Sequence, residues 1–159
     1  TYAQVESEVN MRLEKLADLR GRLLSLVGAD AEAFGPLAAA YRMPKDTPEQ
    51  LAAKQAAIQD ALVGATEVPL DIMRTAAACV EHADFLARNG SRMARSDAGV
   101  SVAFTRAAVD GASLNVYINA ASIDDAERAA RYRDEADRLV AQTREHCDEG
   151  FAFVKDAIS

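Results

Sequence analysis

The chain has 159 residues, half of them apolar, and its 18 Lys and Arg against 25 Asp and Glu give a net charge of −7. This length fits one domain over residues 1–159 with a substantial core, and the negative charge argues against a nucleic-acid surface, which needs a basic stripe. No apolar run approaches the about eighteen residues of a membrane span. Abundant Ala and few Gly, Pro and aromatic residues favour helix over strand. We therefore expect an all-α protein without nucleic-acid or membrane partners.

The first predicted helix is amphipathic and ends at Gly28. Its apolar residues recur at three- and four-residue steps: Val5, Val9, Leu13, Leu16, Leu19, Leu23 and Val27. No capping residue precedes Thr1, so we expect this helix to be already under way there, with further polypeptide upstream. Asp30 then caps a short second helix over residues 31–42, which Pro44 ends.

The sequence Thr-Pro-Glu-Gln at 47–50 predicts a helix start, with a capping Thr, Pro at the first helical position and Gln three residues after the cap. This helix reaches about Glu67. Pro69 is expected to kink or end it, since proline lacks the backbone N–H that a helix interior uses. A further helix then continues to about Arg88, before a loop at 89–91.

Residues 96–119 predict a central helix around which the bundle is organised. Apolar or small residues lie on nearly every face, and a helix that is apolar all round is usually buried. Ser96 and Asp97 stand at its start, where their oxygens can cap the first turn. Asn115 and Asn119 stand near its end. Each should have a partner or a ligand, because burial without one costs about 1–3 kcal/mol.

A turn at 122–125 caps the last predicted helix, which runs from Ala126 towards Ile158 and is roughly 50 Å long at about 1.5 Å per residue. Its inward positions recur at near-heptad steps: Ala129, Tyr132, Ala136, Leu139, Thr143, His146, Gly150 and Val154. This helix either packs along the bundle or contributes part of a dimer interface.

Motifs that identify chemistry by themselves are absent from the sequence: there is no phosphate-binding glycine loop, nucleophile elbow or metal-ligand spacing. His82 and His146 fall on separate helices, and neither is expected to be catalytic. Cys79 and Cys147 lie in helical patterns without redox spacing, which is typical of free thiols in a reducing compartment. With no signal peptide visible, we expect a cytoplasmic protein.

Four segments in fixed order carry a resemblance: DAEAF at 30–34, MPK at 43–45, ATEVPL at 65–70, and SDAGV at 96–100 with LNVYIN at 114–119. Together they resemble the cyclodeaminase/cyclohydrolase family, which comprises the C-terminal domain of formiminotransferase-cyclodeaminase and the stand-alone methenyltetrahydrofolate cyclohydrolases. The resemblance implies an all-helical bundle that forms a homodimer, binds folate and uses no metal. Family members close or open the one-carbon bridge between N5 and N10 of tetrahydrofolate.

Two departures from the family pattern stand beside this resemblance. A glycine-rich segment that family members carry near the N-terminus is absent from these 159 residues. The loop before Ser96 has Ser91 and Met93 where the family tends to have asparagines, and Arg95 replaces an apolar residue.

The chemistry implied by the resemblance singles out carboxylates. The methenyl carbon is part of a delocalised cation, so its hydrolysis needs a base for water and negative charge nearby. Asp30 and Asp97 are the first candidates and Glu67 the third. Lys45 is expected either to pair with the glutamate tail of folate or to donate a proton. The alternative for Asp30 and Asp97 is helix capping, which one residue can combine with catalysis.

Substrate binding is assigned to Ser96, Asn115, Asn119 and Glu67. Asn115 and Asn119 lie one turn apart and are expected either to bind the pterin edge together or to bond the backbone of a neighbouring helix. Asp97 and Asn115 share a face but lie about 27 Å apart along one helix. Either the ligand is long, or a second subunit completes the site.

Two functions remain open at this point. The first is an enzyme, methenyltetrahydrofolate cyclohydrolase or formiminotetrahydrofolate cyclodeaminase. The second is a non-catalytic helical binding or assembly module of the same ancestry.

Overall fold

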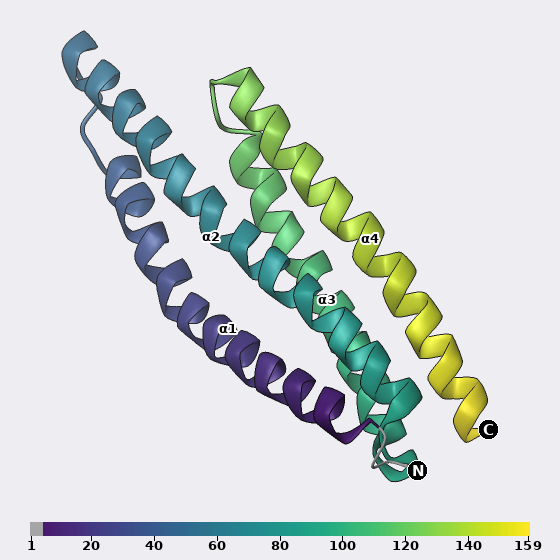
Figure 1. Ribbon diagram of the computed structural model, residues 1–159. Helices are drawn as coiled ribbons and strands as arrows, with labels where there is room; N and C mark the ends of the chain where they lie inside the picture. Colours follow the sequence, from purple (N-terminus) through teal and green to yellow (C-terminus); the bar gives the residue numbers. More distant parts are fainter. Residues whose placement is uncertain (1–4) are drawn as a thin grey trace.

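The protein is an elongated bundle of long helices that lie side by side, as the computed structural model shows (Figure 1). The structure describes residues 5–159. Its elements are α1 (Glu6–Tyr41), α2 (Pro48–Asn89), a short 3₁₀ helix η2 (Arg92–Ala94), α3 (Arg95–Ala120) and α4 (Ala126–Ile158). No strand occurs within this range. The expected all-α bundle is confirmed.

Helix α2 holds the bundle together. It packs against α1 along one side, while α3 and α4 pack against α2 and against each other (Figure 1). The core lies along its length, where Leu62, Leu70 and Met73 are almost completely buried with Val109 and Val116 of α3. Burying each such side chain contributes about 1.5–3 kcal/mol, so this apolar contact is the main stabilising term.

The predicted helix starts are confirmed at two positions. Thr47 Oγ1 accepts from the Gln50 N–H at 3.2 Å, and the Gln50 side chain accepts from the Thr47 N–H, with Pro48 at the first helical position. Asp125 caps α4 by accepting from the Arg128 N–H at 3.0 Å. The buried stripe of α4 follows the expected steps except at His146, which is exposed, and the adjacent Cys147 is buried in its place.

Helix α1 is one continuous helix, so the predicted break at Gly28 and the capping role of Asp30 are wrong. Gly28 keeps an ordinary helical backbone with no positive φ. A helical glycine costs about 1 kcal/mol relative to alanine, and burial of Leu26 and Leu37 against α2 on either side of it offsets that cost. The prediction that the helix is already under way at Thr1 lies outside the described residues.

Helix α2 is also one continuous helix that contains Pro69, so the alternative that Pro69 ends the helix is wrong. Proline has no N–H, so the Ala65 carbonyl one turn earlier loses its helical partner. The Asn119 side chain of α3 supplies a replacement, with Nδ2 donating to Ala65 O at 2.7 Å. A neighbouring helix therefore satisfies the carbonyl that the sequence alone leaves unpaired.

Helix α3 has the predicted extent but is not buried on every side. One side packs into the core through Val102, Val109 and Val116, each fully buried. The opposite side is exposed in the single chain and carries large apolar residues: Val100, Phe104, Leu114 and Ile118. Apolar residues on every face therefore do not mean burial on every face here.

Helix α1 is more apolar than expected. It contains an 18-residue window of mean hydropathy 1.3, of which 17% is buried, so by length and composition alone it is long and apolar enough to cross a membrane. This corrects the expectation that no segment reaches that length. Three of its residues, Leu26, Leu37 and Ala40, are buried in the bundle.

Candidate functional site

A pocket of about 320 Å³ opens between α1, α2 and α3 and brings together three of the predicted site residues. Asp30 enters it from α1, and Asn115 and Asn119 enter it from the end of α3. The aromatic side chains Phe34 and Tyr41 form its α1 wall. We call it the amide pocket.

The two asparagines have different roles in the fold. The amide N–H of Asn119 donates a hydrogen bond to the Ala65 carbonyl oxygen at 2.7 Å. For this residue, the predicted alternative of a bond to the backbone of a neighbouring helix is therefore confirmed. Asn115 is exposed and has no side-chain hydrogen bond to any residue in 5–159. Asn115 is therefore the amide that remains available to a ligand in this pocket.

Asp97 lines a second pocket, of about 360 Å³, at the opposite end of α3. Its walls are mostly apolar and come from Leu13 and Leu16 of α1 and Leu86 of α2. The first helical residue of α3 is Arg95, and no side-chain hydrogen bond caps the helix. Asp97 therefore makes no capping hydrogen bond, although its negative charge in the first turn suits the helix dipole.

Ser96 points to another side of α3 than its neighbour Asp97. It lines a pocket of about 220 Å³ together with Phe151, Val154 and Lys155 of α4. Ser96 and Asp97 thus do not share a site within one chain, because adjacent helical residues face different directions.

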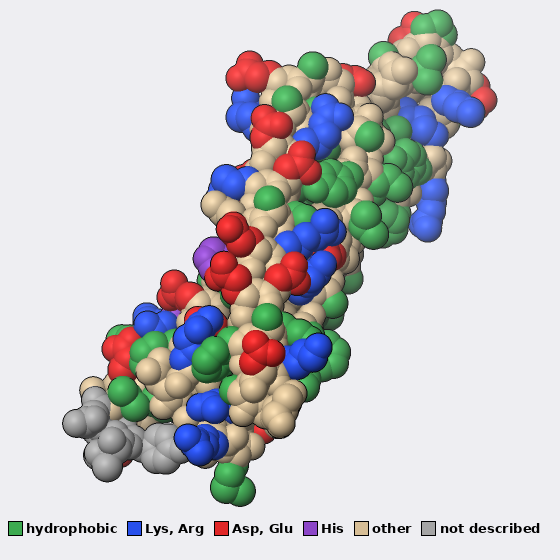
Figure 2. Space-filling model, turned by 90° about the vertical axis from the view of Figure 1, so that its right-hand side faces the viewer, with side chains coloured by type: hydrophobic (Ala, Val, Ile, Leu, Met, Phe, Trp, Pro, Cys, Tyr) green, Lys and Arg blue, Asp and Glu red, His purple; other side chains and the backbone are tan. Residues whose placement is uncertain are grey.

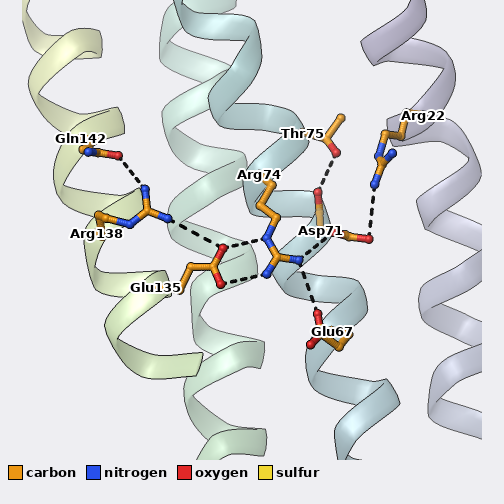
Figure 3. A network of polar contacts seen from close by, with 8 residues as sticks. All are labelled: Arg22, Glu67, Asp71, Arg74, Thr75, Glu135, Arg138 and Gln142. Carbon is orange, nitrogen blue, oxygen red and sulfur yellow. Dashed lines mark hydrogen bonds and ion pairs between the residues drawn. The ribbon is translucent and has the colours of Figure 1, made fainter. Parts of the chain in front are cut away.

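Glu67 belongs to an ion-pair cluster centred on Arg74 (Figure 3). Arg74 donates to both carboxylate oxygens of Glu135 at 2.7 and 2.8 Å, to Asp71 at 2.9 Å and to Glu67 at 3.4 Å. Arg22 of α1 pairs with Asp71 at 3.4 Å. The cluster therefore joins α1, α2 and α4 by charge, and Glu67 is one of its anions.

The pKa shifts in this cluster are those of ion pairs that hold helices together, and we call the Arg74–Glu135 pair between α2 and α4 the clamp. The hydrogen bond to Glu135 raises the pKa of Arg74, and the same bond lowers the pKa of Glu135. Burial, followed by a hydrogen bond with Glu67, raises the pKa of the Tyr132 phenol. These shifts favour the charged forms of Arg74 and Glu135 and the neutral form of Tyr132.

Lys45 lies exposed in the connection between α1 and α2, and it is not among the residues that line the pockets described above. In the part of the chain that the structure describes, no group of three or more His, Cys, Asp or Glu residues is arranged to hold a metal ion. Both cysteines are free thiols, and burial raises the pKa of each.

Sequence reasoning missed the Arg74 cluster and the aromatic wall of the amide pocket. The signal for the first was present: Glu67, Asp71 and Arg74 stand at four- and three-residue steps, so they share one face of α2. Phe34 and Tyr41, seven residues apart, share a face of α1 in the same way. The acidic partner from α4, Glu135, required the tertiary structure.

The fold and the amide pocket together define an all-α protein whose long helices enclose a pocket of mixed polar and apolar lining. Residues 1–138 match the family model described as formiminotransferase-cyclodeaminase. The chain belongs to the formiminotransferase-cyclodeaminase family.

Two relatives illustrate the range of this family. The chain is 39% identical over 141 residues to a methenyltetrahydrofolate cyclohydrolase from Methylorubrum extorquens. The aligned region covers 89% of this chain and 68% of the relative. The chain is also 29% identical over 153 residues to the formimidoyltransferase-cyclodeaminase of Gallus gallus. The aligned region there covers 96% of this chain and 28% of the much longer relative.

A solved structure has the same fold. The formiminotetrahydrofolate cyclodeaminase of Thermotoga maritima matches with a TM-score of 0.75 at 24% identity, over 99% of this chain and 72% of that one. The long-helix bundle is therefore the architecture of this neighbour as well.

Proposed function

We propose that the chain is an enzyme of folate one-carbon metabolism that hydrolyses 5,10-methenyltetrahydrofolate to 10-formyltetrahydrofolate and catalyses the reverse reaction. The observation that carries the proposal is the amide pocket, with Asp30 and Asn115 available in it, in a member of this family. The 39% identity to a protein named as the cyclohydrolase supports this reaction over others.

The chemistry needs few groups because the substrate is already activated. Water adds to the carbon that bridges N5 and N10, and its proton passes to a carboxylate. The bond from that carbon to N5 then breaks, which leaves the formyl group on N10 and releases one proton overall. A carboxylate next to the methenyl cation both stabilises its charge and accepts the proton.

Asp30 and Asp97 are the carboxylates assigned to this task. Asn115 is assigned to the pterin edge with its whole amide group, and Asn119 only through its Oδ1, because its Nδ2 is bonded to the Ala65 carbonyl. Asp30 is exposed and lines the amide pocket from α1, whereas the two asparagines line it from α3. Asp97 lines the more apolar pocket at the other end of α3. The proposal retains Ser96 and Glu67 as substrate contacts and Lys45 as the partner of the glutamate tail or proton donor. It involves no metal.

Cyclodeamination is the second candidate, favoured by the names of the Gallus gallus relative and the Thermotoga maritima neighbour. In that reaction N10 of 5-formiminotetrahydrofolate attacks the formimino carbon, and ammonia leaves with a proton from an acid. The product is the methenyl compound that the first reaction consumes. The same pocket can serve both reactions because both place the reacting carbon between N5 and N10.

The proposal includes a homodimer in the cytoplasm, without a nucleic-acid or membrane partner. The large apolar residues exposed on α3 support self-association. The two free cysteines suit a reducing compartment. The net charge of −7 disfavours nucleic acid and anionic lipid.

Two substrates tested in parallel separate the candidates. A cyclohydrolase removes the near-ultraviolet absorbance of methenyltetrahydrofolate, whereas a cyclodeaminase produces that absorbance from 5-formiminotetrahydrofolate and releases ammonia. A folded chain that does neither, while it still binds folate or a protein partner, would be the non-catalytic module instead.

A further inference from the structure

One hydrogen bond in the amide pocket has a direction that chemistry fixes. The Ala65 carbonyl oxygen can only accept, so the atom of Asn119 that lies 2.7 Å from it is the donor, Nδ2. An amide turned the other way would bring two acceptors together. Asn119 therefore has one orientation, and its Oδ1 lies on the branch of the amide that does not meet Ala65.

Pro69 is the reason that Asn119 has this partner. Residue 69 is the position whose N–H would bond the Ala65 carbonyl in a regular helix, and proline has no N–H. Ala65 and Pro69 are both buried, so a side chain rather than bulk water replaces the missing donor. Pro69, which cannot donate a hydrogen bond itself, thus sets the direction of the Asn119 amide.

Backbone carbonyls at the rim of the pocket have side-chain partners as well. Lys54 Nζ donates to the Tyr41 carbonyl at 2.6 Å, at the end of α1. Gln59 Nε2 donates to the Ser122 carbonyl at 2.9 Å, just after α3. Tyr41 and Ser122 both line the pocket. On the α3 side, a ligand therefore meets the amide groups of the two asparagines.

These two amides differ in what they offer. No residue within 5–159 donates to Asn119 Oδ1, so this side chain offers one acceptor. Asn115 offers both a donor and an acceptor, because its side chain has no hydrogen bond within the same range. Residues four apart are neighbours on one face of a helix. The α3 wall of the pocket therefore presents one donor and two acceptors.

A 2-amino-4-oxopyrimidine ring carries the complementary groups along one edge. Its O4 is an acceptor, and its N3–H and 2-amino group are donors. The Asn115 amide can pair with O4 and N3–H through both of its polar atoms, and Asn119 Oδ1 can accept from the amino group. A ring with a carbonyl oxygen in place of the amino group would bring two acceptors together at Asn119.

We infer that Pro69 is a positioning residue that fixes the Asn119 amide as an acceptor. The amide pocket therefore selects a ring edge with an amino group over one with a carbonyl oxygen at the same position. This inference rests on the proposed function for the presence of such a ring in the pocket. The orientation of Asn119 rests on the contacts of the chain alone.

Two ligands that differ only at this position test the selectivity. Folic acid has the amino group, and its 2-oxo analogue has a carbonyl oxygen there, while the rest of the molecule is the same. Isothermal titration calorimetry measures both dissociation constants. The wild type should bind folic acid about ten- to a hundredfold more tightly, because the analogue leaves Asn119 Oδ1 without a donor.

Replacing Pro69 separates its positioning role from a purely structural one. Pro69→Ala restores the N–H that bonds the Ala65 carbonyl, so the Asn119 amide becomes free to turn and present Nδ2 to the 2-oxo group. The preference for folic acid should then fall by at least about fivefold. The variant Pro69→Ala with Asn119→Asp should recover the preference, since an ionised carboxylate offers only acceptors. An unchanged preference in Pro69→Ala would overturn the inference.

A control variant comes from the opposite side of the bundle. Figure 2 looks onto α4, where acidic and basic side chains alternate along the helix. Asp134 is an exposed residue of α4, and it does not line the amide pocket. Asp134→Asn should therefore change neither dissociation constant.

Nuclear magnetic resonance tests the orientation of Asn119 without a ligand. Its side-chain amide signal is identified by its loss in Asn119→Ala. One Nδ2 proton should exchange slowly with water in the wild type and quickly in Pro69→Ala. Fast exchange in the wild type would overturn the fixed orientation.

The outcomes also separate this inference from the proposed function. Slow exchange with equal binding of the two compounds would overturn the selectivity but not the proposed function, since folic acid binds. A folded wild type that binds neither compound would overturn the assigned ring together with the proposed function. The exchange rates would still decide the orientation of Asn119.

Discussion

The Asn119 side chain donates a 2.7 Å hydrogen bond to the carbonyl oxygen of Ala65, the one carbonyl in its turn of α2 that Pro69 leaves without a helical donor. This contact explains how a proline lies in the middle of a 42-residue helix. The contact also forms part of the amide pocket, because both Asn119 and Pro69 line that pocket.

The first prediction concerns this contact. Asn119→Ala leaves the Ala65 carbonyl without its partner, so we expect the free energy of unfolding to fall by about 1–3 kcal/mol. Urea denaturation followed by circular dichroism measures the change. Asn115→Ala is the matched control and should change stability by less than about 0.5 kcal/mol, since it is exposed and unbonded.

A double-mutant cycle makes this prediction specific. Pro69→Ala restores the backbone N–H that bonds Ala65 in an ordinary helix. In the Pro69→Ala background, Asn119→Ala should lower the free energy of unfolding much less than it does in the wild type. An equal cost in both backgrounds would mean that Asn119 stabilises the protein in some other way.

The second prediction concerns the clamp between α2 and α4. Replacing Glu135 with Gln weakens its paired bonds to Arg74, and we expect a loss of about 1 kcal/mol at pH 7, since both side chains are partly exposed. Glu145→Gln is the control, an exposed acid of the same helix. It should have almost no effect.

The pH dependence of this clamp has a definite sign. Arg74 holds the pKa of Glu135 below its ordinary value, so its stabilisation is fully present above the unfolded-state pKa of about 4.3. It is lost as the pH falls through the lower folded-state value. The difference in stability between the wild type and Glu135→Gln should therefore shrink below about pH 4. A difference that stays constant down to pH 3 would contradict this ionic role.

The third prediction concerns Asp97. We expect Asp97→Asn to slow turnover of methenyltetrahydrofolate by on the order of a hundredfold or more, because it removes a base and a negative charge. Stability should change by less than about 1 kcal/mol, since Asp97 makes no capping hydrogen bond. Rate and denaturation midpoint are measured on one preparation. Near-normal turnover with a lowered midpoint would leave Asp97 a purely structural role.

The fourth prediction concerns the exposed face of α3. Phe104→Glu should convert a dimer into a monomer in sedimentation experiments at low micromolar concentration, because it places two like charges in an apolar contact. Met93→Glu is the control, since Met93 is 93% exposed and lies outside the α3 face. A wild-type chain that sediments only as a monomer would count against the homodimer altogether.

The helices could largely be predicted from the sequence because their signals are local. The capping box at Thr47 and Gln50 and the cap at Asp125 act within one turn, and all are found as expected. The helix ends predicted at Gly28 and, as one of two alternatives, at Pro69 are not found, and the reason is that their signals are not local. Gly28 and Pro69 are tolerated because distant residues offset their cost, Leu26 and Leu37 through burial and Asn119 through a hydrogen bond.

The candidate site could be predicted only in part. Sequence motifs selected Asp30, Asn115 and Asn119, and the structure brings these three into one pocket. The sequence also placed Asp97 about 27 Å from Asn115 along one helix, and the structure accordingly has Asp97 in a different pocket at the other end of α3. Motif order along a chain carries no information about which residues meet across a symmetry axis or between helices. For the same reason, the sequence did not predict that Glu67 takes part in the ion-pair cluster of Arg74.

The most direct test of the proposed function is the initial rate at which purified wild-type protein removes the near-ultraviolet absorbance of 5,10-methenyltetrahydrofolate, corrected for the rate without protein. Asp30→Asn and Asp97→Asn, confirmed as folded by circular dichroism, serve as matched samples. We predict rapid loss of absorbance with the wild type and a far slower loss with both variants. A folded wild type that neither consumes this compound nor forms it from 5-formiminotetrahydrofolate would contradict the assignment as a folate one-carbon enzyme.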